Sequence, residues 1–183
     1  MTARINDFRA AAVARIHEAM PHLRECSEQF GRFDLDELET TMVRAPAVRV
    51  AVLSARVPPQ PSGQADADLA CAAFVVTEGA RRDAEAWTIA EAVATLLHPA
   101  QLFGLTRLGA PGGVAIQPVV SGKLKARSVA IVAVEWRQPL RQLGDNIFDE
   151  QGRLLTELYI NGEEIELPAP PAGDDAKGDG DGA

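Results

Sequence analysis

The chain has 183 residues, 46% of them hydrophobic, and a formal net charge of −8 at pH 7. Its length and apolar content are sufficient for one compact domain with a hydrophobic core. The acidic balance argues against a direct grip on nucleic acid, because phosphates attract basic surfaces. No apolar run reaches the ~18 residues of a membrane span, and charges interrupt the N-terminal segment, so we expect neither a membrane helix nor a signal peptide.

The first predicted element is an amphipathic helix over residues 3–20. Its apolar side chains recur every three or four positions, as on a helix with one buried face, and Pro21 ends it. The acidic segment 30–42 fits either a loop or a loop with one helical turn.

Two strands are predicted next, at residues 46–57 and 69–76. Alternation and β-branched content indicate the first, and the Pro- and Gly-containing loop between them favours antiparallel pairing. Residues 82–97 then predict a second helix, which His98-Pro99 ends. Its broad apolar stripe indicates packing on a sheet and contains Trp87, Ala90, Ala94 and Leu97, widened by Ile89, Val93 and Leu96.

The third and fourth strands are predicted at residues 114–120 and 129–136, and Pro118 indicates that the third is an edge strand. The fourth is apolar on both faces. We expect one face to lie under the two helices and the other to contact a neighbouring subunit. The first face carries Val129, Ile131 and Ala133, and the second carries Ala130, Val132, Val134 and Trp136.

The C-terminal part changes character. Asn161-Gly162 between two short extended runs predicts a tight hairpin, and residues 168–183 have a low-complexity composition typical of disorder. The predicted organisation is an α+β domain over 1–142, an extension with a β-hairpin over 143–167, and a disordered acidic tail. In the domain, an antiparallel β-sheet of about four strands has two α-helices packed on one face.

The sequence contains only weak signals for a catalytic or metal-binding site. Cys26 and Cys71 have no metal-ligand spacing and are expected to be buried and reduced. Asp34, Asp36 and Glu37 belong to one dense carboxylate cluster, which could hold Mg²⁺ in a hydrolase, although a solvated acidic segment is the simpler interpretation. We therefore expect no cofactor and no metal.

Basic residues gather at two places on this acidic chain, and they form either a solvated face or a contact with the acidic surface of a neighbouring subunit. Trp136 and Arg137 add aromatic and cationic side chains of the types enriched at interfaces. The predicted interface residues are Arg81, Arg82, Lys123, Lys125, Arg127, Trp136 and Arg137.

Five segments together carry a family resemblance: IHEAM in the first helix, PAVRV, LACAAFVV, AEAWTIAEAVATLL, and a last core strand that ends in VEWRQPL. In this order they resemble the tail terminator (tail-completion) proteins of long-tailed bacteriophages, particularly the version in Mu-like phages and prophages. The resemblance covers residues 3–142 and leaves the hairpin and the tail as additions.

The resemblance implies a virion structural protein without catalysis, cofactor or metal. Such proteins form a homo-oligomeric ring, usually a hexamer, at the head-proximal end of the tail tube, where they stop tube polymerisation. The expected partners are other copies, the tail tube protein, the head–tail connector and, in some tails, the sheath protein. The genome passes through the lumen without specific binding, and assembly takes place in the host bacterial cytoplasm.

Two alternatives stay open at this point. The chain could be another head–tail joining or minor tail protein of similar fold. It could also be a small metal-dependent hydrolase that uses Asp34, Asp36 and Glu37.

Overall fold

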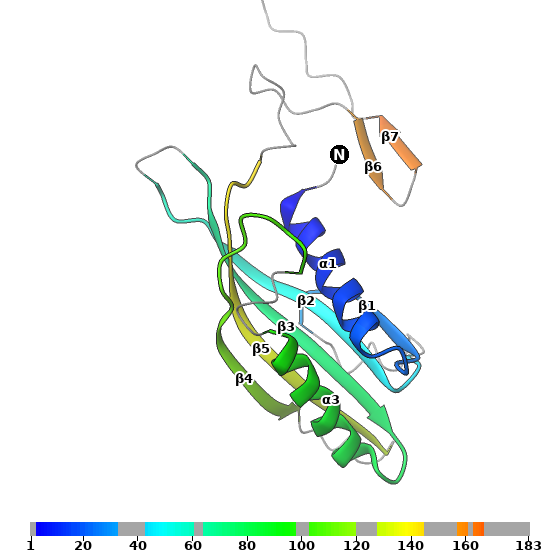
Figure 1. The fold of residues 1–183 in the computed structure, drawn as a ribbon. Coiled ribbons are helices and arrows are strands. Elements are labelled where there is room, and N and C mark those ends of the chain that lie inside the picture. Colours follow the sequence, from blue (N-terminus) through cyan, green and yellow to red (C-terminus); the bar gives the residue numbers. More distant parts are fainter. Residues whose placement is uncertain are drawn as a thin grey trace, which may run out of the picture. The chain divides into compact units, whose positions relative to one another are not determined.

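A computed structural model describes residues 3–32, 43–60, 64–97, 103–119 and 128–144, and the backbone of 157–160 and 163–166. The chain divides into two compact units, Thr2–Asn146 and Ile147–Ala183 with Met1. Figure 1 shows the larger unit as a sheet with two helices in front of it. Its elements are α1 (Arg4–Ala19), β1 (Glu25–Phe30), β2 (Ala47–Arg56), β3 (Ala67–Glu78), α3 (Arg82–Leu96), β4 (Gly112–Val119) and β5 (Val129–Leu140).

The sheet has five strands in the order β1-β2-β3-β5-β4. The pairs β2–β3, β3–β5 and β4–β5 are antiparallel, which confirms that part of the prediction. The prediction of a purely antiparallel sheet of about four strands is wrong, because β1 adds a fifth strand parallel to β2, with Cys26 opposite Val48. The β1 sequence ECSEQF is polar and contains no β-branched residue, so only its pairing with β2 and its contact with α1 make it a strand.

Both helices cover the same face of the sheet, as predicted. Phe8 and Ile16 of α1 and Val93 of α3 are at most 1% exposed and belong to one core cluster with the β-strand residues Val50 and Val134. Burial of each large apolar side chain stabilises the fold by roughly 1.5–3 kcal/mol. The two helices and one sheet face therefore form a single hydrophobic core.

The predicted buried stripe of α3 is confirmed at Ile89, Ala90, Val93 and Leu97 and is wrong at Trp87. Trp87 is 46% exposed, and Ala86 is buried. Alanine and other apolar residues occur all around this helix, so its periodicity alone does not decide which side is buried.

The two edges of the sheet are β4 and β1. Pro118 lies in β4, so its predicted edge position is confirmed. At the other edge, the N–H of Arg24 donates to the carbonyl of Pro46. Because inward and outward residues alternate along a strand, the backbone groups of Glu25, Ser27 and Gln29 point to the outer edge of β1.

The smaller unit contains two strands, β6 (Glu157–Ile160) and β7 (Glu163–Glu166), which pair antiparallel with Leu158 opposite Ile165. The predicted turn residues Asn161 and Gly162 and the acidic tail lie outside the described residues.

Candidate interaction surface

The sheet face away from the helices is divided into a closed half and an open half. The closed half is a second apolar cluster whose members are at most 5% exposed: Ala47, Ala51, Ala72, Phe74, Val76, Ile131 and Ala133. The β5 residues Ile131 and Ala133 belong to it, whereas Val132, Val134 and Trp136 lie under the helices. The expectation that one face of β5 is an open subunit contact is therefore wrong at these positions.

The described residues at the two ends of the β1–β2 connection contact this face. Parallel neighbours require a connection that crosses back along the sheet. At one described end of that connection, Arg32 reaches Glu135 of β5 (Nη1–Oε1, 4.0 Å). At the other end, Val43 packs against the second cluster. Both ends therefore lie on this face.

The open half of the same face carries charged residues. Arg56, Asp68 and Arg137 are exposed, and Glu135 is half-buried. Arg56 lies opposite Asp68, and Arg137 lies opposite Ala70 and Gly112. We call Arg32, Arg56 and Arg137 the arginine patch. It contains Arg137, one of the predicted interface residues, on an accessible surface.

Trp136 is not on that surface. Its side chain is 3% exposed and lies in the main core with Val134, and its Nε1 has no hydrogen-bond partner among the described residues. The structure thus places the predicted aromatic anchor inside the subunit.

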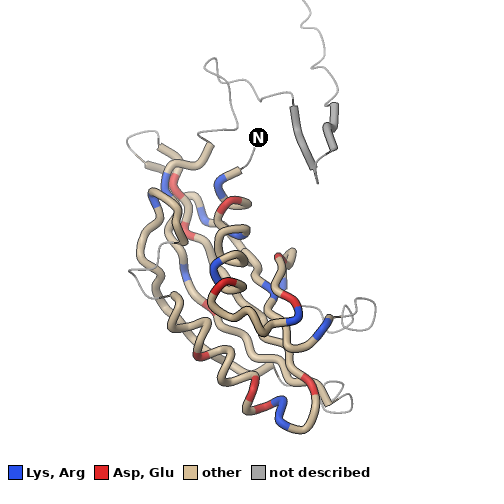
Figure 2. The backbone as a smooth tube through the Cα atoms, turned by 45° about the vertical axis from the view of Figure 1, so that its right-hand side comes forward, with Lys and Arg blue, Asp and Glu red and all other residues tan. Residues whose placement is uncertain are grey.

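Arg81 and Arg82 lie at the start of α3, where Figure 2 shows acidic and basic positions next to one another. Arg82 is engaged locally: its Nη1 donates to the carbonyl of Gly79 at 3.2 Å, and its Nε is 3.6 Å from Asp83 Oδ1. Arg81 is exposed and provides no side-chain cap to the helix. Of this pair, Arg81 is the cation available to a partner.

The outer face of α3 carries a surface that sequence reasoning missed. Trp87 and Glu91 are exposed one helical turn apart. The hydroxyls of Thr88 and Thr95 donate to the carbonyls of Ala84 and Glu91 at 3.0 and 2.9 Å. We call Ala84, Trp87, Thr88, Glu91 and Thr95 the α3 strip. Placing Trp87 in the core concealed it.

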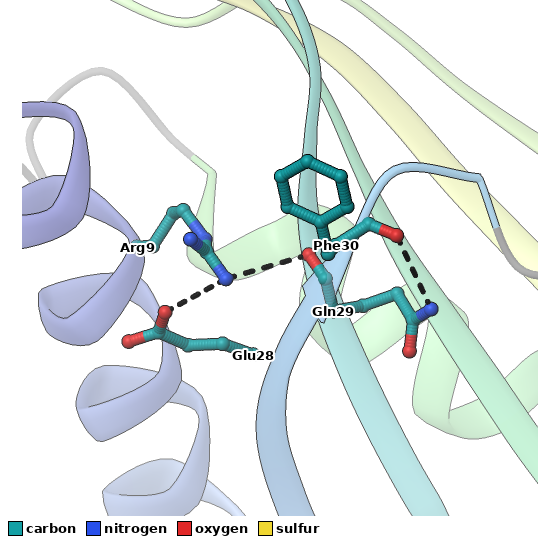
Figure 3. Close-up of polar contacts among 4 residues, drawn as sticks. All are labelled: Arg9, Glu28, Gln29 and Phe30. Carbon is teal, nitrogen blue, oxygen red and sulfur yellow. Dashed lines mark hydrogen bonds and ion pairs between the residues drawn. The ribbon is translucent and has the colours of Figure 1, made fainter. Parts of the chain in front are cut away.

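A polar cluster joins α1 to the outer edge of β1 (Figure 3). Arg9 Nη2 lies 2.8 Å from Glu28 Oε2 and donates to the Gln29 carbonyl at 3.5 Å. Gln29 Nε2 donates to the Phe30 carbonyl, and the Phe30 side chain is 92% exposed. The guanidinium of Arg9 thereby donates a hydrogen bond to one of the carbonyls on the outer edge of β1.

The sheet face away from the helices also holds an ion pair between Arg49 and Glu25, whose Nη2 and Oε1 atoms are 2.5 Å apart. Glu25 Oε2 accepts the backbone N–H of Arg44 at 3.1 Å. Both side chains are less than one quarter exposed. These contacts fix the start of β2 against β1, a structural rather than a recognition role.

Both cysteines are free. Burial, and then the charge of Glu25, raise the pKa of Cys26 to about 11, and burial raises the pKa of Cys71 to about 12. Cys71 is buried as predicted, and Cys26 is half-buried with its Sγ 3.5 Å from the Val13 carbonyl. Raised pKa values make both thiols poor nucleophiles.

The remaining predicted residues fall elsewhere. Lys123, Lys125 and Arg127 lie outside the described residues, as do Asp34, Asp36 and Glu37. Within the described part of the chain, no group of three or more His, Cys, Asp or Glu side chains is placed to hold a metal ion. No helix in that part is long and apolar enough to span a membrane.

Comparison with known proteins does not assign this chain to a family. No protein-family model matches the sequence, and no curated protein matches it.

Proposed function

We propose that this chain is a structural subunit of a phage tail: a tail terminator that forms a ring on the head-proximal end of the tube. One observation carries the proposal: the segments of the resemblance coincide with adjacent elements of one core. PAVRV runs into β2, LACAAFVV lies in β3, AEAWTIAEAVATLL lies along α3, and VEWRQPL ends β5. They therefore form a contiguous packed block rather than scattered matches.

The proposed partners follow from that role. Other copies form the ring, the tube protein contacts one side of it, and the head–tail connector contacts the other. The sheath protein is a further partner in contractile tails. The surfaces available for such contacts include the arginine patch and the α3 strip, which belong to different layers of the domain.

The test is deletion of the gene in a phage or prophage that carries it, with electron microscopy of the particles. We expect tails of uncontrolled length and heads without tails, and a plasmid copy of the gene should restore normal virions. Normal virions from the deletion strain would refute the proposal.

Two matched measurements separate the alternatives. Gold labelling of a tagged chain should mark the junction between tube and head, whereas a minor tail protein would be labelled elsewhere. A plasmid copy with Asp34→Asn, Asp36→Asn and Glu37→Gln should also restore virions, because these carboxylates have no role in a terminator. Failure of that copy, with a folded and abundant protein, would favour the hydrolase.

A further inference from the structure

We infer that Trp87 and Glu91 of the α3 strip receive Arg137 of a second copy of this chain. The inference rests on the proposed function, because it states which surfaces of neighbouring ring subunits meet.

The α3 strip is built to hold a cation. Trp87 is 46% exposed and presents an aromatic surface, and Glu91 lies one turn further along the same side of the helix. Among the described residues, Glu91 has no ion-pair partner. The two threonine hydroxyls of the strip are already bonded to helix carbonyls, so they do not compete for a ligand.

A guanidinium fits this pair better than an ammonium. Arginine stacks on the face of tryptophan and offers planar donors to a carboxylate at the same time, whereas lysine is a compact and strongly hydrated charge. An arginine from a partner could therefore lie over Trp87 with its donors directed at Glu91.

Arg137 has the accessibility that such a contact requires. Its neighbours across the strands are Ala70 on β3 and Gly112 on β4. Neither neighbour carries a long side chain, and Arg137 is exposed. Among the described residues, Arg137 has no ion-pair partner, and the exposed Arg56 on the same face lies opposite the exposed Asp68.

The two surfaces lie on opposite faces of the two-layer domain. The α3 strip faces outward from the helix layer, because the other side of α3 packs on the sheet. Arg137 is on the sheet face away from the helices, with Ile131 and Ala133. A surface on one face that recognises the opposite face of the next copy gives a head-to-tail contact, which closes into a ring when the rotation permits. The opposite charges of Glu91 and Arg137 favour this contact over one that brings two copies of the same residue together.

The first experiment is disulfide trapping in the full chain with Thr88→Cys and Ala70→Cys combined, which places thiols beside the proposed contact and leaves Trp87, Glu91 and Arg137 unchanged. The native thiols interfere little, because their pKa values of about 11 and 12 keep them protonated at pH 8. We expect a ladder of covalent multimers under mild oxidation, whereas each single variant should give at most a dimer. A double variant that yields no more than the single variants overturns the inference.

The second experiment is charge reversal, read out by sedimentation of the assembled fraction with and without tube ends. Glu91→Arg and Arg137→Glu should each weaken association by about tenfold or more at low salt, and the combined variant should restore it. Arg137→Lys should also weaken it, since lysine cannot stack and pair simultaneously. Arg15→Glu, on α1, is the control and should leave the assembled fraction unchanged. Loss without recovery in the combined variant refutes the contact.

The outcomes separate the contact from the proposed function. A ladder and charge-swap recovery, together with normal tails after gene deletion, would leave the contact standing and remove the tail role. Abnormal tails after gene deletion, without a ladder of covalent multimers, would support the tail role and refute the contact. A chain that stays monomeric at all concentrations and with tube ends present overturns the contact.

Discussion

Arg9 of α1 and Glu28 of β1 form an ion pair across two elements, with Nη2 and Oε2 2.8 Å apart. Arg9 also donates to the Gln29 carbonyl, so one side chain ties the first helix to the edge strand. We expect Arg9→Met to destabilise the fold more than Glu28→Gln, because it removes both contacts. Chemical denaturation of a double-mutant cycle should give a coupling of about 0.5–1 kcal/mol.

The control for this pair is Arg15 and Glu18, which are also 2.8 Å apart but lie on one helix and are more exposed. Their coupling should be smaller, about 0.3 kcal/mol. Equal couplings in the two cycles would argue against a special role for Arg9 at the edge.

Truncation of the two tryptophans should change the stability of the fold by very different amounts. Trp136→Ala removes a core side chain that is 3% exposed and should lower the free energy of unfolding by about 3–5 kcal/mol. Trp87→Ala removes a half-exposed side chain and should change it by no more than about 0.5 kcal/mol in the monomer. Urea unfolding of both variants checks this, and the reverse order would contradict the placement of α3.

Gly109 is predicted to resist substitution. A Cβ at this position would lie 2.7 Å from the Cβ of Pro139, which is too close for two carbon atoms. Gly109→Ala should therefore lower the free energy of unfolding by about 1–3 kcal/mol. Gly112→Ala is the matched control, because a Cβ there meets nothing within 4 Å, and it should be neutral or slightly stabilising. Similar thermal melts for both variants would contradict the close approach.

Asp66 should contribute stability that is lost in acid. The Gln142 N–H, and then the Arg141 guanidinium, lower the pKa of this carboxyl below 3.8. Since the folded pKa is depressed, the contribution is present above the unfolded pKa and disappears as the pH falls through the folded one. We expect the stability difference between the wild type and Asp66→Asn to shrink below about pH 4. A difference independent of pH would refute this.

The two thiols should contribute stability that is lost at high pH, whereas the contribution of Asp66 is lost at low pH. Their pKa values are raised from 9.0 to about 11 for Cys26 and about 12 for Cys71, so the folded state favours the neutral form. That contribution is present below pH 9 and is lost as the pH rises toward these values. Stability should fall between pH 9 and 11, less so in Cys26→Ser. Labelling with a thiol reagent at pH 8 should be slow when folded and complete in denaturant; fast labelling of the folded chain would contradict the burial.

The elements with strong periodicity were predictable, and the weakly patterned ones were not. The stripe of Phe8, Ala12 and Ile16 indicated α1, and alternation indicated β2. β1 was missed because an edge strand with one helix above it can be almost wholly polar, and its pairing with β2 depends on residues distant in the sequence.

The candidate surface was predictable only in part. Arg137 was recognised as a cation near an apolar strand, but its exposure depends on Ala70 and Gly112, which only the strand register brings beside it. Sequence showed that both faces of β5 need cover without showing what supplies it. The parallel β1–β2 pairing, which no local pattern signals, adds the fifth strand, and the members of the second cluster are at most 5% exposed.

The contact of Arg9 with the Gln29 carbonyl has a consequence for unwanted aggregation. An open sheet with two bare edges can template endless addition of strands from other molecules. In this protein Arg9 occupies a carbonyl on the β1 edge, and Pro118 removes a donor from the β4 edge. In the described part of the chain neither edge presents an uninterrupted ladder, which disfavours fibre-like growth by backbone pairing between molecules.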